Sequence, residues 1–159
     1  MYQLDQSQLN EYVNQFEART LPKDEWTHEV HLIIGLYIIC RYKKSPLSQM
    51  RKRIIQYNQT VGTINSDTSG YNETITAFWL TAVKNFCQNL TNGYDFDEPT
   101  VDEIIFSPEL TNRNLFLEYY SKDLILSTKA RKNLISPNLK PFPNSSSFNT
   151  PLSKHLSGF

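Results

Sequence analysis

Hydrophobic residues along the chain recur mostly three or four positions apart, which is the spacing of one face of an α-helix. The clearest series comprises Ile75, Phe78, Trp79, Ala82, Val83 and Phe86. No segment alternates hydrophobic and polar residues over the length of a strand. The pattern therefore predicts an all-α fold, a single-domain helical bundle of about six helices.

The first two predicted helices have recognisable start signals. Asp5 followed by Gln8 forms a capping-box pattern, so a helix should begin there. Pro22 suits the first turn of a second helix. From Val30 to Cys40 that helix is hydrophobic on nearly every side, which indicates the central, buried helix of the bundle.

The remaining helices are separated by turn-forming residues. Ser45-Pro46 should open a third helix that Gly62 ends, and Gly93 should end the strong helix described above. Shorter helices are predicted over 99–106, 112–120 and 127–135. We divide the chain into a helical domain, 1–140, and a Pro- and Ser-rich tail, 141–159. The tail should be extended or disordered, with Phe142 and Phe148 available to contact the domain.

Composition narrows the class of protein. The chain has 159 residues, enough for one domain with a hydrophobic core, and 39% of them are hydrophobic. Sixteen basic and sixteen acidic residues balance, which argues against a nucleic-acid binder. The hydrophobic run from Val30 to Cys40 is shorter than the about 20 residues that span a membrane. With no signal-peptide pattern and with Cys40 and Cys87 in helical patterns, we expect no membrane association and a cytoplasmic location; oligomeric state stays open.

A polar segment, "NSDTSGYNETIT" (65–76), lies between two predicted helices and is the first candidate for chemistry. Asn65, Asp67, Ser69 and Gly70 would fill positions one, three, five and six of the calcium-binding helix-loop-helix. However, Asn65 stands where Asp is expected, and Thr76 stands where a bidentate Glu is needed. The pattern therefore argues against calcium of that type. A turn-rich connector that satisfies its own backbone is the simpler interpretation.

The second candidate is "EWTHEVHL" (25–32). His28 and His31 are three residues apart, so on a helix they share one face and could offer two imidazoles to a divalent transition metal. Glu25 before His28 has the spacing of a di-iron bundle, but no second such pair exists. A third ligand would have to come from Glu73 or Asn72, although the helical wheel places Glu73 nearly opposite the hydrophobic face. Alternatively, His31 is a neutral core histidine bonded to a carbonyl.

Together these segments resemble an uncharacterised bacterial family of small helical proteins. The shared pattern is Trp-Thr-His-x-x-His-Leu, then a Gly-Tyr-His-Glu-Thr segment, then Ser-x-x-Ala-Arg (127–131) and Pro-x-Leu-x-Pro (137–141). Asn72 replaces the His of the second segment, which removes an imidazole from any metal site. The family has no established activity. The resemblance implies one common site comprising Trp26, His28, His31, Asn58, Asn65, Gly70, Tyr71 and Glu73.

Two functions remain open from these residues. In the first, a polar pocket formed by His28, His31 and loop 65–73 binds a small molecule or a metal. A catalytic version would use His28 and His31 as bases or ligands and Glu73 as their acidic partner. The other candidate ligand-binding residues are Trp26, Asn58, Asn65, Tyr71 and Asn72. In the second, the protein is a non-catalytic structural or protein-interaction protein. The same residues then form a buried hydrogen-bond network, and the tail or an exposed hydrophobic face contacts a partner.

Overall fold

The computed structural model describes residues 4–90 and 101–142 of the chain. Within those residues all regular structure is helical, with seven α-helices and two short 3-10 helices. The prediction of a single-domain all-α fold is confirmed. No helix in the described part of the chain is both long enough and hydrophobic enough to cross a membrane.

The first two helices begin at capping residues. Helix α1 (Gln6–Ala18) has the predicted capping box between Asp5 and Gln8. Helix α2 (His28–Arg41) begins after Thr27, whose side chain caps it. The prediction that Pro22 opens this helix is wrong, because Pro22 precedes a separate 3-10 helix, η1 (Lys23–Glu25). Glu25 therefore lies on a different element from the two histidines.

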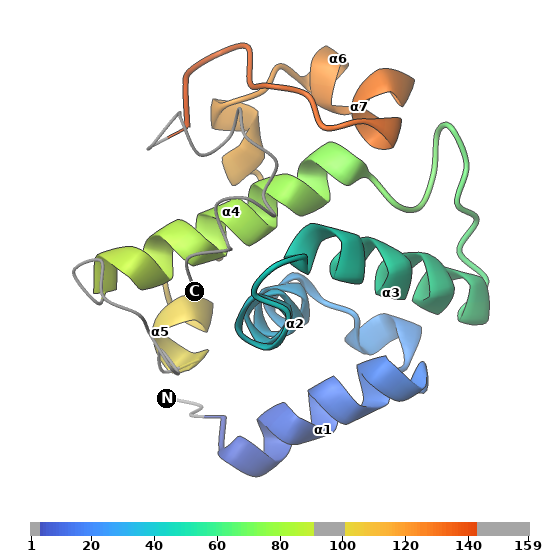
Figure 1. Ribbon diagram of the computed structural model, residues 1–159, viewed down its shortest axis with the longest axis vertical. Helices are drawn as coiled ribbons and strands as arrows, with labels where there is room; N and C mark the ends of the chain where they lie inside the picture. Colours follow the sequence, from blue (N-terminus) through green and yellow to red (C-terminus); the bar gives the residue numbers. More distant parts are fainter. Residues whose placement is uncertain (1–3, 91–100, 143–159) are drawn as a thin grey trace.

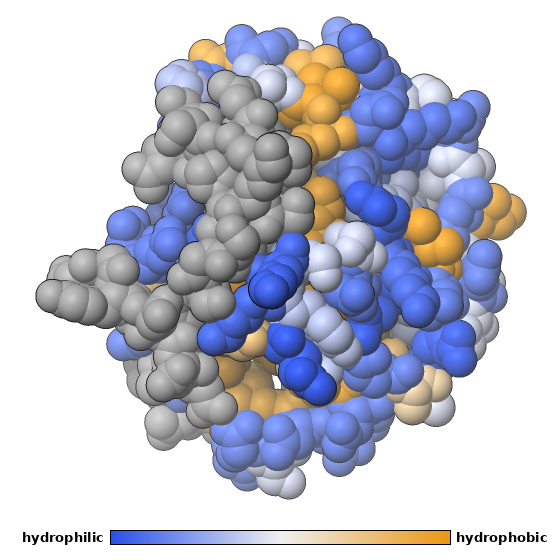
Figure 2. Space-filling view, viewed as in Figure 1, coloured by the Kyte–Doolittle hydropathy of each residue, from blue (hydrophilic) through white to orange (hydrophobic). Residues whose placement is uncertain are grey.

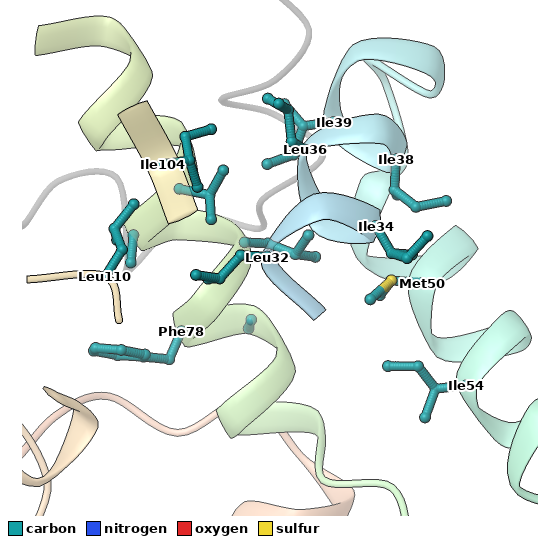
Figure 3. Packing of buried hydrophobic residues seen from close by; sticks show 14 of the residues in the cluster. Leu32, Ile34, Leu36, Ile38, Ile39, Met50, Ile54, Phe78, Ile104 and Leu110 are labelled. Atoms are coloured by element: carbon teal, nitrogen blue, oxygen red, sulfur yellow. The ribbon is translucent and has the colours of Figure 1, made fainter. Parts of the chain in front are cut away.

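Helix α2 occupies the centre of the bundle, as its all-round hydrophobicity predicts. It packs against α1, α3 (Pro46–Thr60), α4 (Glu73–Leu90) and α5 (Val101–Ile105). In Figure 1 it is seen nearly end-on, with α4 on one side and α1 on the other. Figure 3 shows Ile34 and Ile38 directed toward Met50 of α3, while Leu36 and Ile39 point to the side of Ile104. Burying these side chains supplies the main stabilising term of the fold.

Among the described residues on the face drawn in Figure 2, hydrophilic ones predominate. Hydrophobic residues appear there as separate groups. The largest exposed hydrophobic side chains are Ile64, Leu90, Phe106, Leu126 and Leu139. Neither cysteine forms a disulfide within the described residues, and Cys87 is buried while Cys40 is half-buried.

The second half of the chain is less helical than predicted. Residues 112–120 form only a 3-10 helix, η2 (Leu115–Glu118), because the Asn112 side chain accepts the N–H of Asn114 at 3.1 Å and competes with the helix. The predicted helix 127–135 is shorter, α7 (Thr128–Lys132). Helix α6 (Lys122–Ile125) was not predicted.

The last described residue is part of the core. Phe142 packs against Phe78 and Tyr119, with ring centroids 5.0 and 4.8 Å apart. This matches the expectation that Phe142 contacts the domain. Phe148 and the rest of the predicted tail, and Gly93 with its predicted helix stop, lie outside the described residues.

Candidate functional site

The loop between α3 and α4 is organised around one asparagine. The side-chain oxygen of Asn65 accepts hydrogen bonds from Nδ2 of Asn58 at 2.9 Å and from the N–H of Tyr71 at 3.1 Å. Its Nδ2 donates to the carbonyl of Ile55 at 3.2 Å. One side chain thus ties both ends of the loop to the last turns of α3.

Gly70 is required where the loop closes on Asn65. Its φ of 75° lies in the left-handed region, which favours glycine. A Cβ at this position would come within 2.5 Å of Oδ1 of Asn65 and 2.6 Å of the carbonyl oxygen of Ile64. The close approach lets the chain turn directly into α4.

Glu73, the predicted acidic partner of the histidines, is engaged elsewhere. Its carboxylate accepts from Nε and Nη2 of Arg51 on α3, at 2.9 and 2.5 Å, and from the hydroxyl of Tyr71 at 2.6 Å. Burial, and secondly the charge of Glu73, raises the pKa of Tyr71, and the bond to Glu73 raises the pKa of Arg51. The carboxylate therefore connects the start of α4 to α3.

Asn72, the second candidate for a third ligand, caps α4. Its side-chain oxygen accepts the N–H of Ile75 at 2.9 Å, which satisfies a donor that the first turn leaves free. Its Nδ2 donates to the carbonyl of Ile125 at 3.1 Å and so ties α4 to α6. Both functional groups of the side chain are thus occupied by the fold.

The two histidines each bond to a backbone carbonyl. Nε2 of His28 lies 2.7 Å from the oxygen of Leu110, and Nδ1 of His31 lies 2.6 Å from the oxygen of Thr27. A carbonyl only accepts, so these nitrogens carry the protons. The His28 ring packs on Trp79 with centroids 4.6 Å apart, and the His31 ring packs on Trp26 at 3.7 Å.

His31 is held in one neutral tautomer. The surrounding protein atoms desolvate the ring and lower its pKa to about 4, although the bond to Thr27 acts in the opposite direction. With Nδ1 protonated, Nε2 of the neutral ring presents a lone pair. The structure gives this Nε2 no hydrogen bond to the described residues, so it is free to accept one.

A cavity of about 520 Å³ lies among η1, α2, α3, α4 and α7. Most of its wall is hydrophobic, and both tryptophans of the chain belong to it. Its hydrophobic and glycine residues are Trp26, Leu32, Gly35, Met50, Ile54, Val61, Gly70, Ile75, Trp79, Leu80 and Val83. Its remaining residues are Lys23, His31, Tyr57, Asn58, Thr63, Tyr71, Asn72, Thr76 and Arg131.

The cavity contains only part of the predicted site. Among the candidates, the wall comprises Trp26, His31, Asn58, Tyr71 and Asn72. His28, Asn65 and Glu73 do not belong to this wall. Asn65 and Glu73 instead hold wall residues in place, through their bonds to Asn58 and Tyr71.

The metal hypothesis receives no support from the described residues. No group of three or more His, Cys, Asp or Glu residues within them could hold a metal ion. Glu73 is paired with Arg51, and the side chain of Asn72 is used by helix α4 and Ile125. His28 and His31 therefore have no third ligand there.

Arg131 and Trp79 are wall residues to which the sequence pattern assigned no role. Nη1 of Arg131 donates to the carbonyls of Gly70 and Tyr71, at 2.9 and 3.2 Å, and its Nε is buried without a hydrogen-bond partner. The Ser-x-x-Ala-Arg segment that ends in Arg131 was the available signal. Trp79 was identified only as part of the hydrophobic face of α4.

Comparisons with protein-family models, with curated proteins and with solved structures find no match to this chain.

Proposed function

We propose that this protein binds a small, mostly hydrophobic molecule in the cavity beside α2, α3 and α4, with Nε2 of His31 accepting a hydrogen bond from it. The observation that carries the proposal is a cavity of about 520 Å³ whose hydrophobic wall includes one imidazole nitrogen without a protein partner. Ligand pockets usually measure about 300 to 1,000 Å³ and combine such walls with a few fixed polar groups.

The position of His31 favours binding over acid–base catalysis. Thr27 fixes the ring from one side and Trp26 packs against its face, so the acceptor is oriented before a ligand arrives. A pKa near 4 keeps the imidazole neutral but makes it a weak base at neutral pH. The ligand would therefore present a donor, such as a hydroxyl or an N–H, to this nitrogen.

The alternative role, a structural hydrogen-bond network, fits a different subset of the residues. Within the fold, the side chains of Asn65 and Glu73 each make three hydrogen bonds and the side chain of Asn72 makes two. We assign Asn65 and Glu73 to support of the cavity wall, and Asn72 to a structural position within that wall. The resemblance to the bacterial family is consistent with this division, because its shared residues include both wall and supporting positions.

Gly35 offers a direct test, because it is a wall residue on α2. A Cβ there would meet Leu80 Cδ2 at an ordinary 3.7 Å, so Gly35→Ala should fold normally, whereas the side chain of Gly35→Met would occupy the cavity. Isothermal titration with phenylbutanol, a hydrophobic molecule with one hydroxyl, should show binding to the wild type and to Gly35→Ala. Gly35→Met should not bind it.

The melting temperatures of both variants serve as the folding control for this titration. Equal affinity of phenylbutanol for the wild type and for a folded Gly35→Met would place the bound molecule outside the cavity and refute the proposal. Gly35→Ala should still bind phenylbutanol, because the added methyl group makes only an ordinary contact of 3.7 Å with Leu80. If a folded Gly35→Ala does not bind it, this part of the prediction is wrong.

A further inference from the structure

We infer that the molecule bound in this cavity carries a negatively charged group, specifically a carboxylate, that pairs with the guanidinium of Arg131. The inference rests on the proposed function and specifies the chemical class of its ligand. That class is an amphipathic carboxylate with a hydrophobic or aromatic body.

The formally charged residues in the wall of the cavity are all positive. Lys23 and Arg131 are the wall residues that carry a formal charge, and no Asp or Glu belongs to the described wall. His31 adds none, because its ring is neutral. A hydrophobic wall lowers the local dielectric, so the attraction of these cations for an anion is stronger there than in water.

Hydrogen bonds hold Arg131 in place, but they engage only part of its guanidinium group. Its Nη1 is bonded to the carbonyls of Gly70 and Tyr71, which hold the guanidinium against the end of the loop. Its Nε is buried and has no hydrogen-bond partner, and the structure gives Nη2 no bond to the described residues. A buried donor without a partner is rare in folded proteins and indicates a missing acceptor.

Arg51 of the same protein shows what the Nε and Nη2 edge of a guanidinium binds. Arg51 holds the carboxylate of Glu73 through Nε and Nη2, the fork that fits two carboxylate oxygens. In Arg131 the equivalent edge is the one left without protein partners. Two acidic residues of the loop and of the start of α4 are already paired, Glu73 with Arg51 and Asp67 with Lys132 at 2.6 Å. The acceptor for Arg131 would therefore come from a ligand.

The polar wall residues His31 and Arg131 require different groups on the ligand. A carboxylate placed at Nε2 of His31 would bring two sets of lone pairs together, which is unfavourable. The anion is therefore assigned to Arg131 and the donor group to His31. Hydrophobic side chains such as Ile54 and Leu80 form the wall that would cover the body of the molecule.

A matched series of probes separates charge from hydrophobicity. Octanoate, octanol and octylamine share one chain and differ in charge, and phenylbutyrate, phenylbutanol and phenylbutylamine repeat the series with a ring. Because Trp26 and Trp79 both belong to the wall and are the only tryptophans of the chain, their fluorescence reports occupancy. We expect each carboxylate to bind about tenfold more tightly than its alcohol, and each amine more weakly. Higher ionic strength should reduce this preference.

Two variants locate the charge effect. Arg131→Gln keeps an amide that can donate to the loop carbonyls but removes the cation, and it should abolish the preference for the carboxylate over the alcohol. Lys23 is exposed, and its side chain makes no hydrogen bond to the described residues. Lys23→Gln should therefore reduce the preference for the carboxylate over the alcohol only about twofold. Lys129→Gln, two residues from Arg131 and outside the cavity wall, is the control and should change nothing.

The outcomes distinguish this inference from the proposed function. Alcohols that bind as tightly as carboxylates, or a preference unchanged in a folded Arg131→Gln, would overturn the carboxylate while leaving a hydrophobic ligand in place. No binding by any of the six probes would overturn the proposed function and the inference together. If Arg131→Gln does not fold, the comparison of the three charges on the wild type and on Lys23→Gln decides the matter.

Discussion

Gly70 and Gly62 bound the loop at the edge of the cavity, and both have a φ in the left-handed region, 75° and 78°. They differ in their surroundings. An added Cβ at Gly70 would overlap Asn65 and Ile64, while at Gly62 nothing lies within 4 Å. The pair therefore separates the cost of a left-handed conformation from the cost of close packing.

We predict that Gly70→Ala lowers the free energy of unfolding by about 3 kcal/mol, from conformational strain and steric overlap together. Gly62→Ala should cost about 1 kcal/mol, from strain alone. Urea denaturation of the two variants measures both values. Equal costs would mean that the contact between Gly70 and Asn65 does not organise the loop.

The depressed pKa of His31 links stability to pH. In the unfolded chain the imidazole takes up a proton near pH 6.5, whereas in the folded protein it does so only near pH 4. Between these values the unfolded state binds more protons, so stability falls as the pH falls. From pH 7.5 to pH 5 we expect a loss of up to about 2 kcal/mol, less where the cavity hydrates the ring.

Urea denaturation at a series of pH values measures this loss, with His31→Gln as the control. The variant has no imidazole at this position, so its stability should fall less over the same range. The difference between the two curves isolates His31 from the carboxylates. Parallel curves for the two proteins would show that His31 titrates normally and is not desolvated by the fold.

At the scale of the elements, the connections of α4 decide both its position and the shape of the cavity. Arg51 and Glu73 connect it to α3, Asn72 connects it to α6, and Thr74 connects it to α7 and the segment that follows. The hydroxyl of Thr74 also accepts the N–H of Ile135 at 3.1 Å. These contacts, rather than helix propensity, position the first turn of α4.

We predict that Glu73→Gln lowers the free energy of unfolding by about 1 to 2 kcal/mol, since it weakens a charge-assisted pair in which Glu73 is nearly buried but solvent partly screens the exposed Arg51. It should change the affinity for phenylbutyrate by less than about twofold, because Glu73 is not a wall residue. Glu118→Gln, which breaks an exposed pair with Lys140, is the control and should cost almost nothing. If Glu73→Gln lost phenylbutyrate binding while its stability was unchanged, Glu73 would belong to the ligand site and this assignment would be wrong.

Thr74 and Thr81 are both buried on α4, but their hydroxyl groups have different partners. Thr81 bonds only to the carbonyl of Ala77 in its own helix, at 2.8 Å. Thr74→Val should therefore cost about 1 to 3 kcal/mol and Thr81→Val less than about 1 kcal/mol. Thermal and urea denaturation of the two variants measures the difference. A Thr74→Val protein as stable as Thr81→Val would show that the connection to α7 is unimportant.

Local signals predicted the elements that local contacts determine. The capping box at Asp5 and the Ser45-Pro46 helix start depend on residues a few positions apart, and both are confirmed. The end of α7 was mispredicted because distant Thr74 bonds the carbonyls of Ala130 and Asn133. Hydrophobic periodicity alone contains no information about that contact.

The same distinction applies to the candidate site. Trp26, His31 and Tyr71, which the sequence placed in one site, all belong to the wall of the same cavity. Glu73 was assigned to the histidines because a sequence does not show which cation a carboxylate meets, and here it is Arg51 on another helix. Arg131 is held beside the loop by its hydrogen bonds to two loop carbonyls, and the Ser-x-x-Ala-Arg segment indicated the residue but not these contacts.

At the scale of the whole molecule, the bundle surrounds α2 with its neighbours and leaves a cavity on one side of it. Trp26, which follows η1, and Trp79 of α4 both belong to that cavity wall. They are the only tryptophans of the chain, so a proton–nitrogen NMR spectrum contains just two indole signals. Those signals report directly on whether the cavity is filled.

The measurement that tests the account most directly is a titration of the protein with phenylbutyrate followed by such spectra. We predict that the indole signals of Trp26 and Trp79 shift together and saturate, while amides of α1 outside the cavity, such as that of Glu11, stay unchanged. Shifts confined to residues beside exposed Ile64, Leu126 and Leu139, with both indole signals unmoved, would contradict a ligand site in the cavity.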